Sequence, residues 1–130
     1  MAECAKPLIL IVDDSFEGIL ILKSWLLEAG YAVQGAGDGL EALGKATMRM
    51  PDLVICDVIL PSMLGWELCQ RLKEMASPRH LPVIMLTGRS TASDEMRSYE
   101  SLADDHFTKP ADRHKLLAAV ARHLPARSSP

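Results

Sequence analysis

Five polar residues of this 130-residue chain stand at the ends of short predicted strands, and together their side chains could bind a cation and accept a phosphoryl group. In chain order they are Asp13, Asp14, Asp57, Thr87 and Lys109. Carboxylates are the ligands that hard cations such as Mg²⁺ prefer, and a carboxylate can also act as a nucleophile. A lysine and a hydroxyl group can hold the oxygens of an added phosphoryl group. The set therefore predicts phosphoryl transfer to a carboxylate, provided that the fold brings these residues together.

The apolar runs that precede Asp13, Asp57 and Thr87 are typical of strands buried on both faces of a parallel sheet, and a short fifth strand is predicted before Lys109. The predicted strands cover Leu8–Val12, Tyr31–Ala36, Leu53–Cys56, Leu81–Leu86 and Asp105–Thr108. The predicted helices, which alternate with them, cover Phe16–Ala29, Leu40–Met50, Trp66–Met75, Thr91–Leu102 and Asp112–Leu124. This alternation predicts an α/β fold with helices on both faces of a parallel sheet. The carboxyl ends of such strands share one edge, where ligands normally bind.

Length and composition limit the remaining choices. One compact domain is expected over residues 1–124, with its core over about 7–124 and a frayed tail at 125–130. A net charge of -3 gives no general attraction to nucleic acid or anionic membranes, and no apolar stretch approaches the length of a membrane span. Three cysteines without paired or metal-binding spacing favour a reducing compartment, so a cytoplasmic location is expected.

Each polar residue taken alone also has an ordinary structural interpretation. Single carboxylates after strands are often helix caps or turn formers. The histidines at positions 80, 114 and 123 lack ligand spacing and are expected to be solvated surface residues. The coincidence of five suitable residues at strand ends is what favours a functional site.

Several stretches around these residues carry the motifs of a known family. The segment Ile11–Ser15 resembles an acidic first-strand motif, and Asp52–Pro61, with Gly65 downstream, resembles a phosphoacceptor strand. The segments Pro82–Thr87 and Ala103–Pro110 match the fourth and fifth strands of the same pattern. On these motifs, the chain resembles the response-regulator receiver domains of two-component signalling, including the single-domain chemotaxis type, over roughly residues 7 to 124.

The resemblance implies a flavodoxin-like, doubly wound (βα)5 fold with a five-stranded parallel sheet in the strand order 2-1-3-4-5. It implies a phosphorelay switch rather than an enzyme with an external substrate. Asp57 would receive a phosphoryl group from a histidine kinase or a phosphotransfer protein, and the domain would catalyse its own phosphorylation and slow dephosphorylation. The output would pass to an unidentified downstream protein or to an output domain fused in a longer parent chain, without direct contact to nucleic acid or membrane.

The resemblance also implies a metal site. Asp14 and Asp57 would bind Mg²⁺ directly, and Asp13 would bind it mainly through water. The backbone carbonyl of Ile59 would complete the protein ligands, and Mn²⁺ could substitute for Mg²⁺. No other cofactor is implied.

The remaining implied roles concern the phosphoryl group and the switch. Thr87 and Lys109 would hold phosphoryl oxygens, and the bond between Lys109 and Pro110 is commonly cis in such domains. Position 106 usually carries Tyr or Phe, whose ring changes rotamer as Thr87 moves; this chain has His106. Two interpretations stay open: a tolerated, half-exposed ring, or a ring whose titration near neutrality makes the output depend on pH.

Three other functions are considered. Phosphatases of the haloacid-dehalogenase type also use a strand-end Asp with Mg²⁺, but the stretch Asp13–Glu17 does not satisfy their Asp-x-Asp-x-(Thr/Val) pattern. A phosphorylation-independent adaptor would have no use for the intact acidic set, whose carboxylates repel one another. A flavin-binding module would need a Gly/Ser/Thr-rich phosphate loop after the first strand, which this sequence lacks.

Overall fold

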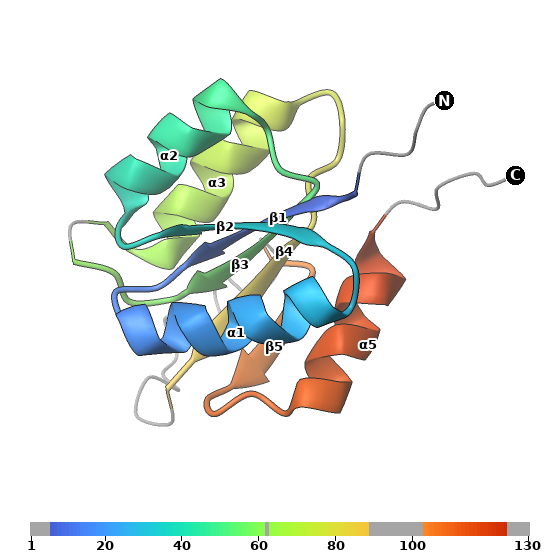
Figure 1. Ribbon diagram of the computed structural model, residues 1–130. Coiled ribbons are helices and arrows are strands. Elements are labelled where there is room, and N and C mark those ends of the chain that lie inside the picture. Colours follow the sequence, from blue (N-terminus) through green and yellow to red (C-terminus); the bar gives the residue numbers. More distant parts are fainter. Residues whose placement is uncertain (1–5, 62, 89–102, 125–130) are drawn as a thin grey trace, which may run out of the picture.

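Five parallel strands form a single sheet in the order β2-β1-β3-β4-β5 (Figure 1). The computed structural model describes residues 6–61, 63–88 and 103–124. The strands are β1 (Leu8–Val12), β2 (Ala32–Ala36), β3 (Leu53–Asp57), β4 (Val83–Thr87) and β5 (Asp105–Thr108). The predicted doubly wound fold and its strand order are confirmed.

Helices cover both faces of this sheet. The described helices are α1 (Phe16–Glu28), α2 (Gly39–Met48), α3 (Gly65–Ala76) and α5 (Arg113–His123). In Figure 1, α2 and α3 lie on one side of the sheet, and α1 and α5 lie on the other. The helix predicted over Thr91–Leu102 lies outside the described residues. None of the helices in the described part of the chain has the length and apolar character needed to cross a bilayer.

Alternate residues of β1 belong to two separate apolar cores, one on each face of the sheet. In β1, Leu10 and Val12 belong to the apolar cluster beneath α2 and α3, whereas Ile9 and Ile11 belong to the cluster beneath α1 and α5. All five residues of β1 are buried. Burial on both faces fixes the register of β1, because a slip by one residue would exchange its two sets of side chains.

The ends of α1 follow from local sequence. Ser15 caps its N-terminus as predicted, and the Ser15 side chain accepts a hydrogen bond from the Gly18 N–H at 3.1 Å. At the C-terminus, Gly30 has φ of 100°, which glycine adopts without strain. The N–H of Tyr31 returns to the Leu26 carbonyl at 3.1 Å, completing a Schellman motif. Because Tyr31 closes this motif, β2 begins at Ala32, one residue later than predicted.

Two other boundaries differ from the sequence-based prediction because of proline. Strand β4 begins at Val83 rather than Leu81, since Pro82 has no N–H to contribute to the sheet. Helix α2 ends at Met48, two residues before the predicted end; the chain is already extended at Arg49, ahead of Pro51.

We expect Gly65→Ala to destabilise the fold, because Gly65 at the start of α3 lies against the backbone of β3. An added Cβ would overlap the Asp57 carbonyl oxygen and lie 2.9 Å from the Val58 Cα. Overpacking of this kind costs about 1–3 kcal/mol of unfolding free energy, measurable by urea denaturation. The matched control is Gly44→Ala on α2, where an added Cβ meets nothing within 4 Å. That change should stabilise the protein by up to about 1 kcal/mol; equal midpoints for the two variants would contradict this account.

Candidate functional site

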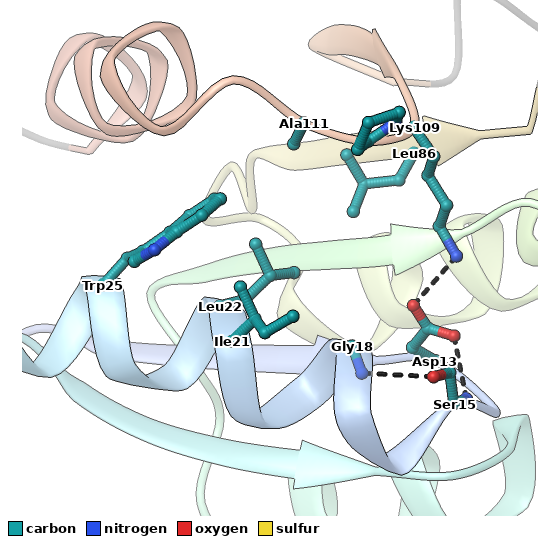
Figure 2. A pocket seen from close by; sticks show the side chains of 10 residues that line it. Asp13, Ser15, Gly18, Ile21, Leu22, Trp25, Leu86, Lys109 and Ala111 are labelled. Atoms are coloured by element: carbon teal, nitrogen blue, oxygen red, sulfur yellow. Dashed lines mark hydrogen bonds and ion pairs between the residues drawn. The ribbon is translucent and has the colours of Figure 1, made fainter.

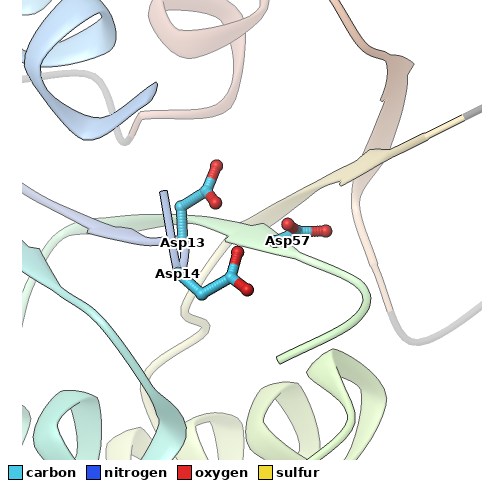
Figure 3. A group of neighbouring side chains, drawn as sticks. All are labelled: Asp13, Asp14 and Asp57. Atoms are coloured by element: carbon cyan, nitrogen blue, oxygen red, sulfur yellow. The ribbon is translucent and has the colours of Figure 1, made fainter. Parts of the chain in front are cut away.

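Three carboxylates converge at the carboxyl edge of the sheet, where the strand order reverses. Asp13 and Asp14 follow β1, and Asp57 is the last residue of the neighbouring strand β3. The register pairs Val12 with Cys56, so the next residues, Asp13 and Asp57, lie abreast. One oxygen from each of the three carboxylates lies within 4.8 Å of the other two (Figure 3). We call these three residues the acidic cluster.

Lys109 connects two members of the acidic cluster. Its Nζ donates to Asp13 Oδ2 at 2.9 Å and to Asp57 Oδ2 at 2.9 Å. Its backbone N–H donates to the Thr87 carbonyl at 2.7 Å, which ties the end of β5 to the end of β4. Burial alone would lower the pKa of Lys109, but the hydrogen bonds that Lys109 donates to Asp57 and Asp13 outweigh it and raise that pKa. The peptide bond between Lys109 and Pro110 is cis, as the resemblance implied.

The members of the acidic cluster differ in how much of each carboxylate the protein itself engages. Asp13 is 3% exposed; its Oδ1 accepts from the Ser15 N–H at 3.0 Å and its Oδ2 from Lys109. Asp14 is exposed. Asp57 is half-buried, and burial raises its pKa above the ordinary value, with Lys109 and the Ile59 N–H acting in the opposite direction. Asp14 is therefore the most accessible member, whereas Asp13 and Asp57 each have both carboxylate oxygens hydrogen-bonded within the protein.

The loop after β3 brings the Ile59 backbone beside the acidic cluster. The Ile59 N–H lies 3.3 Å from Asp57 Oδ1, and the Ile59 side chain is half exposed. An isolated antiparallel bridge joins Ile59 to Leu64, and the Gly65 N–H donates to the Val58 carbonyl at 2.6 Å. The loop thus turns back on itself immediately after Asp57.

Thr87 and His106 lie on the neighbouring strands β4 and β5. Thr87 pairs with Thr108 and Met85 pairs with His106, so Thr87 and His106 project from the same face of the sheet. The His106 Nε2 is buried and has no hydrogen-bond partner among the described residues. The His106 ring centroid lies 5.9 Å from that of Trp66, at an interplanar angle of 52°. Trp66 is 5% exposed and contacts His106, the predicted switch residue.

Other polar networks lie at the opposite, amino-terminal edge of the sheet, and the sequence did not reveal them. Asp104 accepts from Lys73 Nζ at 2.8 Å and lies 2.9 Å from His80 Nε2. Asp105 lies 3.0 Å from His123 Nε2. The prediction of a solvated surface ring holds for His80, whose side chain is 68% exposed, but is wrong for His123, at 23%. His123 is drawn inward because α5 packs its last turn onto the start of β5.

Two cavities flank the acidic cluster. The larger, of about 580 Å³, runs along α1 toward Lys109 (Figure 2). Its wall is mostly apolar, with Ile21, Leu22 and Trp25 from α1. The smaller, of about 470 Å³, lies between α1 and the start of α2 and reaches Asp14. The cluster is thus open to approach along both sides of α1.

The sequence matches the family model described as the response regulator receiver domain over residues 9–121. The chain therefore belongs to this family, whose members are phosphoacceptor signalling switches.

Three known proteins illustrate the similarity. The transcriptional regulator RpaA of Synechocystis is 42% identical over 115 residues, which are 88% of this chain and 47% of RpaA. The chain thus spans about half the length of this curated relative. Chemotaxis protein CheY4 of Vibrio cholerae has a TM-score of 0.82 and 31% identity, covering 92% of this chain and all of CheY4. The response regulator TrrA of Thermotoga maritima, solved with Mg²⁺-BeF, has a TM-score of 0.76 and 31% identity, covering 89% of this chain and 97% of TrrA.

We expect Asp57→Asn to stabilise the metal-free protein at pH 7. The folded-state pKa of Asp57 lies above its ordinary value, so the ionised group opposes folding once the pH exceeds that raised pKa. Removing the charge removes this penalty, while Lys109 keeps its ion pair with Asp13. The gain should vanish as the pH falls below the ordinary value of 3.8, where Asp57 is protonated in both states. Urea midpoints in EDTA from pH 3 to 8 test this, and a variant less stable than wild type at pH 7 would contradict it.

Proposed function

We propose that Asp57 accepts a phosphoryl group from the phosphohistidine of a histidine kinase or phosphotransfer protein. The observation that carries this proposal is the environment of the Asp57 carboxylate. It stands at the carboxyl edge with Oδ2 on Lys109 at 2.9 Å and with two further carboxylates within 4.8 Å. Attack by an Asp57 oxygen forms the O–P bond of an acyl phosphate as the N–P bond to the imidazole breaks. Lys109 and Thr87 then hold the phosphoryl oxygens.

The residues present fit a Mg²⁺ ion, and Mn²⁺ would be accepted by the same oxygens. Asp14 and Asp57 offer oxygens for direct ligation, and the Ile59 carbonyl is the proposed backbone ligand. Asp13 would act mainly through water, as the family resemblance implies, and it is the most buried of the three carboxylates, at 3% exposed. The bound cation would neutralise charge on the carboxylates and on the phosphoryl oxygens. The similarity to TrrA, solved with Mg²⁺-BeF, supports this assignment.

The phosphorylated state would be read out through Thr87 and His106. A Thr87 hydroxyl drawn toward the phosphoryl group leaves space on the face of the sheet that it shares with His106, two residues away in register. His106 would then change rotamer and leave its contact with Trp66, shifting the population of the output surface. Hydrolysis of the acyl phosphate by water, catalysed by the domain itself, would end the signal.

The surface around the acidic cluster favours a protein as phosphoryl donor. Helix α1 starts beside Asp14 and exposes large apolar side chains, with Phe16 73% exposed and Ile21 53% exposed. An apolar helix face continuous with the reaction site suits a protein surface that carries the phosphohistidine. The recipient of the signal would be a separate protein or an output domain in a longer chain, as in the DNA-binding regulator RpaA. A cytoplasmic location is part of this proposal.

Phosphorylation is tested by intact-mass analysis after incubation with Mg²⁺ and acetyl phosphate. We expect one phosphoryl adduct on the wild-type protein, dependent on Mg²⁺ and absent from Asp57→Asn. The matched control is Asp52→Asn, at the other end of β3, where Asn can still accept the hydrogen bond that Asp52 accepts from the Leu8 N–H. The control should be labelled like wild type, because its carboxylate lies at the opposite edge of the sheet.

Loss of labelling in both variants would point to a folding defect, which circular dichroism would detect. An unlabelled wild-type protein that also fails to bind fluoroberyllate would overturn the proposal in favour of a phosphorylation-independent adaptor.

The switch is tested by the indole N–H signal of Trp66 in NMR spectra. Fluoroberyllate, which stands in for the phosphoryl group, should shift this signal in the presence of Mg²⁺ in wild type but not in Asp57→Asn. His106→Ala should reduce the shift by more than half, because the ring 5.9 Å from Trp66 is removed. His114→Ala, at an exposed position on α5, serves as the control and should leave the shift unchanged. A full shift in His106→Ala would exclude His106 from the switch.

A further inference from the structure

The side chain of Met63, in the loop between β3 and α3, lies directly on the backbone of Gly39 at the start of α2. A Cβ atom built on Gly39 would be 2.8 Å from the Met63 Sδ, 3.2 Å from its Cε and 3.3 Å from its Cβ. Gly39 is buried, and Met63 packs against the core cluster beneath α2 and α3. The whole length of the Met63 side chain therefore occupies the space that a side chain at position 39 would fill.

Met63 belongs to the loop that leads away from Asp57. This loop is closed by the bridge between Ile59 and Leu64 and by the Gly65 N–H bond to Val58. Those contacts hold the loop to itself and to the end of β3. The Met63 contact with Gly39 joins the loop to α2, and together with Leu60, which is buried in the core cluster, it fixes how the closed loop lies over the edge of the sheet.

The start of α2 is a rigid surface for this contact. Asp38 caps the helix by accepting from the Glu41 N–H at 2.8 Å, and Glu41 Oε1 accepts from the Gly37 N–H at 2.8 Å. The Gly37 hydrogen bond is the main cause that lowers the pKa of Glu41, with Lys45 second. Lys45 in turn donates to the Gly35 carbonyl at 2.5 Å, which ties α2 back to β2. Side-chain and backbone hydrogen bonds thus hold the start of α2, on which Met63 packs, in place.

We propose that Met63 is a positioning residue for the metal site. Position 39 is glycine because a side chain there would occupy the space that Met63 fills. The contact would hold the loop so that the Ile59 carbonyl and Asp57 present their oxygens together. Mg²⁺ requires near-ideal octahedral geometry with ligands at about 2.0–2.1 Å, so a displaced carbonyl ligand weakens binding. The inference rests on the proposed function, because it assigns Mg²⁺ to the acidic cluster.

The atom distances explain why a methyl group at position 39 must move the loop. The Sδ and Cε atoms of Met63 can rotate away from an added Cβ. The Met63 Cβ cannot, because it is fixed to the loop backbone, and it too would lie only 3.3 Å from the added atom. The backbone at Met63 would therefore have to shift, and the closed loop would carry that shift toward Ile59.

The test is a calorimetric titration with Mg²⁺ of wild type, Gly39→Ala and Gly44→Ala. Both substitutions add one methyl group to α2, but an added Cβ at Gly44 meets nothing within 4 Å. We expect Gly39→Ala to bind Mg²⁺ about tenfold more weakly, in the range typical for loss of a contact that orients metal ligands. Gly44→Ala should bind like wild type. Both variants should unfold cooperatively in EDTA, which separates a displaced loop from a damaged fold.

Removal of the Met63 side chain shows whether the effect passes through this contact. We expect Met63→Gly, which removes the Cβ as well, to weaken Mg²⁺ binding alone, and Gly39→Ala to have no further effect in the Met63→Gly background, because the added methyl group then meets no side chain at position 63. A further tenfold loss in the double variant, or wild-type affinity in Gly39→Ala, would overturn the inference. If wild type itself neither binds Mg²⁺ nor is labelled at Asp57, the proposed function fails; normal binding and labelling in every variant removes only the role of Met63.

Discussion

Like-charge repulsion at the carboxyl edge of the sheet is the constraint on which the rest of the site depends. Three carboxylates lie within 4.8 Å of one another. At an effective dielectric constant of about 20, two unit charges at such a distance repel by roughly 3–4 kcal/mol. One ammonium group, that of Lys109, bridges Asp13 and Asp57 and leaves the group of four with two excess negative charges. A divalent cation would supply the two positive charges that balance this excess. Burial raises the pKa of Asp57, which means that the folded protein disfavours the ionised form of this carboxylate.

The apolar core is what holds these charges together against their repulsion. Asp13 and Asp57 lie abreast because Val12 and Cys56 are paired, and that pairing is fixed by side chains buried on both faces of β1 and β3. A register slip would turn both sets of apolar residues to the wrong face. The strands set the spacing of the carboxylates, and burial of apolar side chains stabilises those strands. The acidic cluster therefore forms despite the repulsion between its members.

The sequence predicted the features that depend on one strand at a time. Apolar runs located β1, β3 and β4, and the polar residues that follow them located Asp13, Asp57 and Thr87 at the carboxyl edge; the strand before Lys109 is short and mostly polar. The strand order came from the family resemblance, since periodicity does not encode which strands are neighbours. The sequence could not predict the contacts of Met63 with Gly39 and of His106 with Trp66 either, because periodicity does not show which elements pack together. Each joins elements whose separation in the folded chain depends on how helices lie on the sheet.

The components of the site are thereby held in two different ways. Asp13, Asp57 and Lys109 are carried at or just beyond the ends of strands, so the hydrogen-bond ladder of the sheet sets their relative places. The Ile59 carbonyl, the proposed backbone ligand, lies in the loop after β3, so side-chain packing rather than pairing with a neighbouring strand holds its position. The positions of these three groups are insensitive to changes in neighbouring side chains, because many backbone hydrogen bonds between strands hold each strand in place. The loop relies on side-chain packing, with Leu60 in the core cluster and Met63 on Gly39, so a change in side-chain volume at Gly39 acts on the loop directly.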